Sequence, residues 1–376
     1  MIDGQGAEYS WSIYKNDSRI DCSRVLESGS IGFGMSFLGT QLGLKGHVID
    51  LAGKVMGLQT YGKVDLEYLQ ALSKYNIRNT DSKIFRNIVS KTAQYGMFDI
   101  SSIDNKLNAA RTLHEKAGEI ILDLFNEHAS SDMNIAYSGG VAQNVIWNTK
   151  LKQVYKNLEV LPHVSDEGLS LGGIEFLRKH FNLPKFDFSS FPYMQSDESV
   201  EEPSQDTIDQ AAEYLAQGKI VAWYQGNGEI GPRALGNRSI LMDPRIENGK
   251  DVINKVKKRE YFRPFGASIL SEYAKEYFDL DFENPYMLYV GVTQKDNLKS
   301  ITHVDGTCRV QTVSKEGSFR SLLQTFNKKT GCPVLLNTSL NISGKPIAGH
   351  VVDAIYEYEN TGIDVLIVGN TVYKKS

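Results

Sequence analysis

The chain has 376 residues, 41% of them hydrophobic and 23% charged, with a formal net charge of −4. This ordinary composition gives no reason to expect general nucleic-acid binding or attachment to a membrane surface. No apolar run approaches membrane-spanning length and no leader peptide is visible, so we expect a cytoplasmic protein of two domains. The three cysteines lack the CxxC spacing of a zinc site.

Residues 1–182 alternate strand and helix patterns, as α/β proteins do. The predicted elements, in chain order, are a strand or hairpin that breaks at Asn16-Asp17, an amphipathic helix around 113–128, a strand over 134–137, a helix from about 141, a strand over 158–161 and a helix through 181. His128 is predicted to cap or flank the end of its helix rather than to bind a ligand.

Residues 183–205 hold prolines, serines and acidic residues, so this stretch is predicted to be a surface linker. A second α/β region covers residues 206–376. It begins with a predicted helix over 207–217, which Asp206 is expected to cap and Gly218 to end. A buried strand is predicted over 220–224.

The segment from Arg233 to Arg263 is the most unusual part of the chain. It contains nine Lys or Arg and four Asp or Glu, a charge of +5 in a chain of −4. Glycines beside arginines let the backbone approach a ligand whose anionic oxygens the guanidinium groups bind. The segment therefore predicts a site for a phosphorylated small molecule. A solvated charged face is the alternative, although glycine and proline are poor residues for an amphipathic helix.

Four groups in this region resemble parts of a site, and each could instead be a capped turn or a surface ion pair. They are Glu229 with Arg233, Arg238 and Ser239; Lys257, Arg259 and Arg263, which would project together from an extended segment; the polar residues of 303–311; and the Asn/Thr/Ser cluster that ends an apolar strand at 337–341.

The first region offers weaker signals. The amides of Ser138-Gly139-Gly140 could approach a nucleotide, but many α/β folds use such a turn structurally. Asp3 and Asp166 could share a metal ion, yet two carboxylates without a nearby histidine make a poor case, and on chemistry alone we interpret them as turn formers.

Residues 226–241, 254–265, 303–311 and 333–341 together resemble, in order, the C-terminal signature of the carbamoyltransferases that modify nodulation factors, antibiotics and related acceptors. Upstream, 54–58, 138–144 and 166–168 also match. The resemblance implies that 1–182 is similar to the second subdomain of an actin/sugar-kinase-like fold, and that 206–376 is similar to the YrdC fold. It also implies a two-step reaction, in which carbamoyl phosphate and ATP give carbamoyl-adenylate and the carbamoyl group then moves to an acceptor hydroxyl.

The resemblance assigns the predicted site residues. Catalytic anion clamps would be Arg233, Arg238, Lys257, Arg259 and Arg263, joined by His303 and Asp305, whose roles cannot be separated. Carbamoyl phosphate and ATP would be bound by Glu229, Ser239, Arg309, Asn337, Ser339, Asn341, Ser138, Gly139, Gly140 and Asn144. Mg²⁺ is expected in the adenylate step, and Asp3 and Asp166 match carboxylate metal ligands of the family.

The chain departs from the family at its N-terminus. The family opens with a subdomain that carries a phosphate loop and a His-x-x-x-His pair for a metal, usually iron, whereas no two of the seven histidines here are four apart. We therefore expect Fe²⁺ or another divalent metal only if a partner polypeptide supplies histidines, and the chain is either half of a split enzyme or a truncated copy. The acceptor could be a sugar, an antibiotic scaffold or a modified nucleobase. The alternatives are a tRNA threonylcarbamoyladenylate synthase and a non-catalytic partner that binds nucleotide or protein.

Overall fold

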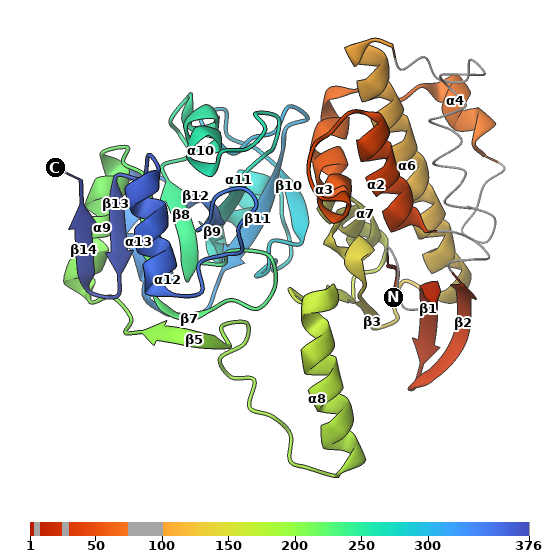
Figure 1. The fold of residues 1–376 in the computed structure, drawn as a ribbon, viewed down its shortest axis with the longest axis horizontal. Helices are drawn as coiled ribbons and strands as arrows, with labels where there is room; N and C mark the ends of the chain where they lie inside the picture. The colour runs from red at the N-terminus through yellow and green to blue at the C-terminus, as the bar shows by residue number, and fades with distance from the viewer. Residues whose placement is uncertain (4–7, 25–29, 74–100, 376) are drawn as a thin grey trace. The chain divides into compact units, whose positions relative to one another are not determined.

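The computed structural model describes residues 1–3, 8–24, 30–73 and 101–375. The chain divides into two compact units, Met1–Asp166 and Glu167–Ser376 (Figure 1). Both contain helices and strands, which confirms the mixed α/β class, while the predicted domain limits at 182 and 206 stay predictions. Within the described ranges, no helix combines the length and the apolar character that crossing a membrane requires.

The first unit opens with the predicted hairpin. Strands β1 (Tyr9–Lys15) and β2 (Ser18–Arg24) pair antiparallel, and Asn16 and Asp17 form the two-residue turn between them with φ of 50° and 62°. A turn with two positive φ values matches the twist of the flanking strands, and Asn and Asp tolerate this conformation better than most residues. The glycines of the segment 4–6, which follows Asp3, lie outside the described residues.

Among the described residues, this unit contains the helices α2 (Ile31–Gln41), α3 (Val48–Leu58), η1 (Gln59–Tyr61), α4 (Leu66–Ala71) and α6 (Ile103–His128). The predicted amphipathic helix is confirmed as α6, whose Leu113, Ala117, Ile120 and Leu124 are each at most 3% exposed (Figure 1). His128 ends α6, and its Nε2 lies 3.1 Å from Asp21 Oδ2 of the hairpin.

The glycine turn region also follows the prediction closely. Strands β3 (Ile135–Tyr137) and β4 (Leu158–Val160) pair parallel. The helix predicted from 141 is instead a 3₁₀ turn, η2 (Gly140–Gln143), followed by α7 (Val145–Val154). Asn144 separates the two because its side chain accepts hydrogen bonds from Ile146 N and Trp147 N and caps α7. After η3 (Asp166–Gly168) comes α8 (Leu169–His180).

One buried histidine gives the first unit a pH dependence. Burial, with the charges of Arg111 and Lys150, lowers the pKa of His114 to about 3, and its ring stacks on Trp147 at 4.6 Å. Because the folded pKa lies below the unfolded value, the unfolded chain binds more protons, and stability falls as pH falls below about 6.5. We expect about 1 kcal/mol to be lost between pH 7 and pH 5.5. Urea unfolding should show this loss in the wild type and not in His114→Gln; an equal loss in both would contradict it.

The second unit is built on a mixed eight-stranded sheet of order β10-β11-β9-β12-β8-β6-β13-β14 (Figure 1). Its strands are β6 (Val221–Tyr224), β8 (Arg238–Met242), β9 (Gly266–Leu270), β10 (Tyr289–Val292), β11 (Thr307–Val313), β12 (Val334–Ser339), β13 (Val365–Val368) and β14 (Thr371–Lys374). Besides α8, its helices are α9 (Gln205–Ala216), α10 (Gly249–Lys257), α11 (Ala274–Phe278), which follows η4 (Ser271–Tyr273), α12 (Ser318–Thr330) and α13 (Val351–Asn360). The apolar core lies between this sheet and its helices.

Two details of the second unit correct the sequence analysis. Ser204, not Asp206, caps α9, because its Oγ accepts the hydrogen bond from Thr207 N. The predicted linker also contains a strand, β5 (Gln195–Val200), which pairs antiparallel with β7 (Gly226–Gly228). The linker stretch therefore borders the segment that leads into the basic region.

Candidate functional site

Strand register places the polar residues of four central strands on one face of the sheet. Ser268 pairs with Gln311, and Gly266 of the same strand face pairs with Asn337. Ser339, two residues after Asn337, pairs with Ser239. Directly paired residues and residues two apart share a face, so this face carries the predicted Ser239, Asn337 and Ser339 together.

Arg238 points to the opposite face. It is adjacent to Ser239 in β8, and its guanidinium lies 3.5 Å from the ring centroid of Tyr224, its partner in β6. The same guanidinium donates hydrogen bonds of 2.6–3.1 Å to the backbone carbonyls of Gln225, Asn237, Glu198 and Gly226. Arg238 is only 2% exposed. These contacts occupy both Nη atoms, while Nε is buried without a hydrogen-bond partner, and the role of Arg238 as an anion clamp stays a prediction.

The Glu229 carboxylate is held by backbone amides of the following loop. Its Oε1 accepts hydrogen bonds from the backbone N–H groups of Leu235 at 2.7 Å, Asn237 at 2.8 Å and Arg238 at 3.2 Å. The side chain is 4% exposed. A carboxylate that accepts hydrogen bonds from three amides can hold the loop that carries Arg233, while the predicted binding of carbamoyl phosphate or ATP by Glu229 stays a prediction.

Lys257 joins two of the predicted groups. It is the last residue of α10, and Lys258 then takes a left-handed conformation with φ 51°, so the segment is not extended as predicted. Lys257 Nζ donates to Ser339 O at 2.5 Å, Ser339 Oγ at 3.1 Å and Asn341 Oδ1 at 2.5 Å. The helix end therefore brings an ammonium group to the end of β12.

Arg259 and Arg263 follow this helix end. Arg259 Nε donates to Asn254 Oδ1 at 2.8 Å, and its guanidinium lies 4.1 Å from the ring centroid of Phe265. Arg263 Nη1 lies 3.9 Å from Glu260 Oε2. Both arginines are half-buried. Stacking on an aromatic ring leaves the edge of a guanidinium available for hydrogen bonds, and Arg259 Nη2 donates one of these to Pro264 O at 3.0 Å.

Five basic side chains are grouped by the charges that act among them, and we call them the cation cluster: Arg233, Lys257, Arg259, Arg263 and Arg309. Burial and then the charges of Arg309, Arg263 and Arg259 hold the pKa of Arg233 well below its usual range. Burial, then Arg259 and Arg263, does the same to the pKa of Lys257. Burial and the Arg263 charge lower the pKa of Arg309 to about 10.

Two members of the cation cluster hold an unused donor. The Nε atoms of Arg233 and Arg309 are buried and have no hydrogen-bond partner. Crowded cations that lower one another's pKa are unfavourable until a negative charge enters, and buried donors without partners carry a desolvation cost. The arrangement is therefore suited to a polyanion that several guanidinium groups contact at once.

The predicted pair His303 and Asp305 lies in a tight turn. Asp305 is exposed, and its Oδ1 accepts from Thr307 N at 3.0 Å and Thr307 Oγ1 at 2.7 Å. His303 is buried, and its backbone N–H donates to Thr307 O at 2.8 Å. These contacts give Asp305 a turn-forming role at the start of β11, and a catalytic role for either residue stays a prediction.

In the first unit, the predicted residues around the glycine turn do meet. Asp3 Oδ2 accepts from Gly140 N at 3.2 Å, and Gly139 N donates to Val164 O at 2.6 Å. Gly139 has φ 99°, and a Cβ there would lie 2.1 Å from Ile2 O, so only glycine fits. Ser138 O accepts from Ile2 N. Asn144 caps α7, and its Nδ2 lies 3.0 Å from His114 Nε2, so its predicted role in binding carbamoyl phosphate or ATP stays a prediction.

The predicted metal ligands do not form a complete donor set. Among the described residues, the group of three side chains that could hold an ion is Asp21, Glu127 and His128 rather than one that includes Asp3 or Asp166. Two carboxylates alone do not fit the mixed nitrogen and oxygen donor sets typical of iron. The residues present therefore do not fit the iron site that the family resemblance implied.

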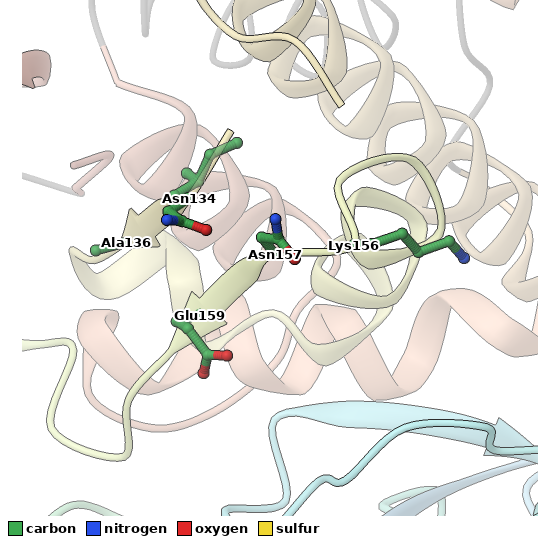
Figure 2. Close-up of a pocket in the computed structure, with 6 residues that line it drawn as sticks. Asn134, Ala136, Lys156, Asn157 and Glu159 are labelled. Carbon is green, nitrogen blue, oxygen red and sulfur yellow. The ribbon is translucent and has the colours of Figure 1, made fainter. Parts of the chain in front are cut away.

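A hollow of about 370 Å³ lies beside β3 and β4. Figure 2 shows its lining, which comprises Asn134, Ile135, Ala136, Lys156, Asn157 and Glu159. None of these is a predicted site residue. One lysine and one glutamate among neutral side chains give this hollow no particular charge, in contrast to the cation cluster of the second unit.

Sequence reasoning missed several residues that shape the site. Tyr193 lies in the predicted linker, yet its hydroxyl donates to Leu235 O at 3.0 Å. Ser268 Oγ donates to Gln311 Oε1 at 2.7 Å and accepts from Asn337 Nδ2 at 2.9 Å. The apolar run around Ser268 could have drawn attention to it, since a hydroxyl inside a buried strand needs a partner. Nothing in the sequence singles out Tyr193.

Fold and site together define an α/β protein with a cationic site on its second unit. Two family descriptions match the chain: "Carbamoyltransferase N-terminus" over residues 1–174 and "Carbamoyltransferase C-terminus" over residues 212–375. The chain belongs to the carbamoyltransferase family.

Two curated relatives illustrate the range of this family. The nodulation protein NolNO of Sinorhizobium fredii is 36% identical over an aligned length of 294, and the match covers 70% of this chain and 43% of the relative. The 3'-hydroxymethylcephem-O-carbamoyltransferase of Amycolatopsis lactamdurans is 34% identical over an aligned length of 280, and the match covers 71% of this chain and 54% of the relative. The chain thus spans about half the length of these relatives. Among solved structures, Sua5 of P. abyssi complexed with L-threonine is 19% identical, with a TM-score of 0.35 over 46% of this chain and 50% of that one.

Proposed function

We propose that the second unit makes carbamoyl-adenylate from carbamoyl phosphate and ATP, and that the carbamoyl group then passes to an acceptor hydroxyl. The observation that carries this proposal is the cation cluster, in which burial and neighbouring positive charges lower the pKa of Arg233, Lys257, Arg259 and Arg309, and two guanidinium nitrogens lack a partner. Carbamoyl phosphate and ATP are both polyanions. A site for the two must offset the repulsion between them, which isolated cations could not do.

The proposed first step balances with one molecule of water. Water releases inorganic phosphate from carbamoyl phosphate, and an oxygen of the resulting carbamate attacks the α-phosphorus of ATP. The bond from the α-phosphorus to the bridging oxygen breaks, and pyrophosphate leaves with the electron pair. Arg233 and Arg309 each have an Nε donor without a partner that could bind a phosphate oxygen. Lys257 and Arg259 add positive charge to the same cluster.

Magnesium enters this proposal as the ion that accompanies ATP. A cluster of five basic side chains repels a free divalent cation, so Mg²⁺ would arrive bound to the triphosphate. There it would neutralise charge on the leaving pyrophosphate. The residues of the cation cluster would bind the phosphate oxygens that the ion leaves exposed.

Transfer to the acceptor is a separate part of the proposal. The relatives named as O-carbamoyltransferase and nodulation protein are about twice as long as the matched part of this chain. We propose that the transfer step uses a polypeptide that supplies histidines beside Asp3 and Asp166. In that arrangement the chain by itself would make carbamoyl-adenylate and would leave the acceptor unmodified until the partner is present.

The test is to incubate the protein with ATP, Mg²⁺ and carbamoyl phosphate, and to measure inorganic phosphate, pyrophosphate and carbamoyl-adenylate. We expect one phosphate and one pyrophosphate for each carbamoyl-adenylate, and no pyrophosphate without carbamoyl phosphate. Lys275→Ala, which removes an exposed lysine outside the cation cluster, should behave as the wild type. Product formed from threonine, bicarbonate and ATP instead would identify a threonylcarbamoyladenylate synthase. Nucleotide binding without turnover would favour the non-catalytic alternative.

A further inference from the structure

Arg233 belongs to the cation cluster but stands on a loop without regular structure, between the end of β7 at Gly228 and the start of β8 at Arg238. A long flexible side chain on such a loop would lose much conformational entropy on binding a phosphate. A useful anion clamp on this loop therefore needs the loop itself to be fixed beforehand.

One carboxylate fixes the inner side of this loop. Glu229 Oε1 accepts the N–H groups of Leu235, Asn237 and Arg238 at 2.7, 2.8 and 3.2 Å. Hydrogen bonds to an ionised acceptor are about twice as strong as neutral ones. Glu229 is four residues before Arg233 in the chain. The first amide that Glu229 binds, that of Leu235, is two residues after Arg233. The carboxylate therefore closes the loop around Arg233.

Three other side chains hold the outer side. Leu235 O accepts from Gln311 Nε2 at 2.7 Å and from Tyr193 OH at 3.0 Å, while Ala234 O accepts from Asn337 Nδ2 at 3.4 Å. Both polar groups of the Leu235 backbone are thus bonded to side chains. In a strand, these backbone groups would pair with another strand. In this loop they bind the side chains of Glu229, Gln311, Tyr193 and Asn337 instead.

The competing role for Glu229 is direct contact with substrate as a base or ligand. The side chain is 4% exposed, and its Oε1 is committed to three amides. Its Oε2 is buried without a hydrogen-bond partner. A general base must come within hydrogen-bond reach of the proton that it removes. A carboxylate enclosed by the loop it organises is better placed to orient that loop than to touch a phosphate.

We infer that Glu229 is the positioning residue of the site: it holds Arg233 toward the phosphate substrates through the amides of Leu235, Asn237 and Arg238. The assignment rests on the proposed function, in which Arg233 binds those substrates. Whether Glu229 holds the loop can be measured by hydrogen exchange at the loop amides, without any turnover.

The experiment compares Glu229→Ala and Glu229→Gln with the wild type by hydrogen exchange and by adenylate formation. The glutamine keeps a carbonyl oxygen that can accept the same amides, whereas alanine removes it. We expect Glu229→Ala to speed exchange at the amides of Leu235 and Asn237 at least about tenfold and to lower kcat/KM about 10²-fold. Glu229→Gln should keep most of both properties. Glu213→Ala, at an exposed glutamate that pairs with Lys329, is the matched control and should change neither.

The outcomes separate the inference from the proposed function. If Glu229→Gln keeps the amides protected and yet is as inactive as Glu229→Ala, then Glu229 acts through its charge and the positioning role is wrong. Unchanged exchange in Glu229→Ala would also overturn it. If the wild type makes no adenylate, the proposed function fails. The positioning role of Glu229 is then tested by measuring the binding of inorganic pyrophosphate instead of turnover. The positioning role then predicts weaker pyrophosphate binding in Glu229→Ala than in Glu229→Gln, and equal binding contradicts it. If Glu229→Ala does not fold, Glu229→Gln still decides between position and charge.

Discussion

Replacing Arg309 by methionine is expected to abolish adenylate formation and at the same time to make the protein more stable. Arg309 is half-buried in the cation cluster, where burial and the neighbouring Arg263 lower its pKa to about 10. A lowered pKa of a basic group means that the folded state penalises its charge. Methionine keeps a flexible apolar stem and removes that charge. We expect a gain of about 1 kcal/mol, seen as a rise of roughly 2–4 °C in Tm.

Activity should change in the opposite direction. In phosphoryl transfer an arginine that stabilises the transferring group contributes about 10³–10⁵-fold in rate, so we expect a loss of at least 10³-fold in carbamoyl-adenylate formation. Added pyrophosphate should raise the Tm of the wild type, because the anion relieves the repulsion among the positive charges of the cation cluster. It should leave the Tm of Arg309→Met nearly unchanged, because that variant lacks the Arg309 charge.

Arg320→Met provides the matched control. Arg320 donates to Glu272 and lies 3.2 Å from Glu316, and these partners, the Glu272 hydrogen bond first, raise its pKa. Removing this arginine should lower stability slightly and leave adenylate formation intact. If Arg309→Met proved less stable than the wild type and equally active, the cation cluster would be a structural ion network and not a site.

Local patterns were enough to predict several elements of the fold. The hairpin turn at Asn16-Asp17 follows from the tolerance of Asn and Asp for positive φ, and α6 follows from the spacing of Leu113, Ala117 and Ile120. Both rules use residues within one or two turns of each other. These rules apply where local interactions determine the backbone conformation and tertiary contacts are not needed.

The direction of side chains was harder to predict, because it depends on where an element begins or ends. Arg238 and Ser239 were grouped together, yet β8 places them on opposite faces. Lys257 and Arg259 were expected to lie in an extended segment, but α10 runs to Lys257 and ends with Lys258 at φ 51°. Glycine is the usual residue at such a helix end, so a lysine there gives no signal in the sequence.

The candidate site was predicted as a set of residue types rather than as an arrangement. The number of basic residues between Arg233 and Arg263 indicated an anion site, and four members of the cation cluster came from that count. Which polar residues touch substrate and which hold the loop depends on tertiary contacts, such as Gln311 of β11 with Leu235 and Glu229 with Asn237. These contacts join segments up to 76 residues apart, and no local rule describes them.

A single methyl group at Gly236 is expected to disrupt the same loop from the opposite side. Gly236 has φ 113°, and a Cβ there would lie 2.3 Å from Cδ1 of the Phe319 ring in α12. Alanine rarely adopts this backbone conformation, and the ring belongs to a side chain that is 5% exposed and cannot easily move. Strain and overpacking together should cost about 3 kcal/mol in the free energy of unfolding. Urea denaturation of Gly236→Ala measures this cost directly.

Gly331→Ala separates the two causes. Gly331 has φ 70° at the C-terminal cap of α12, and nothing lies within 4 Å of its Cβ position, so alanine there should cost only about 1 kcal/mol. Because Gly236 stands between the anchored Leu235 and Asn237, its substitution should also release Arg233 and lower adenylate formation in the molecules that remain folded. Equal destabilisation by the two substitutions, with full activity in Gly236→Ala, would mean that the loop is not held against Phe319. The rigidity of Arg233 would then need another source.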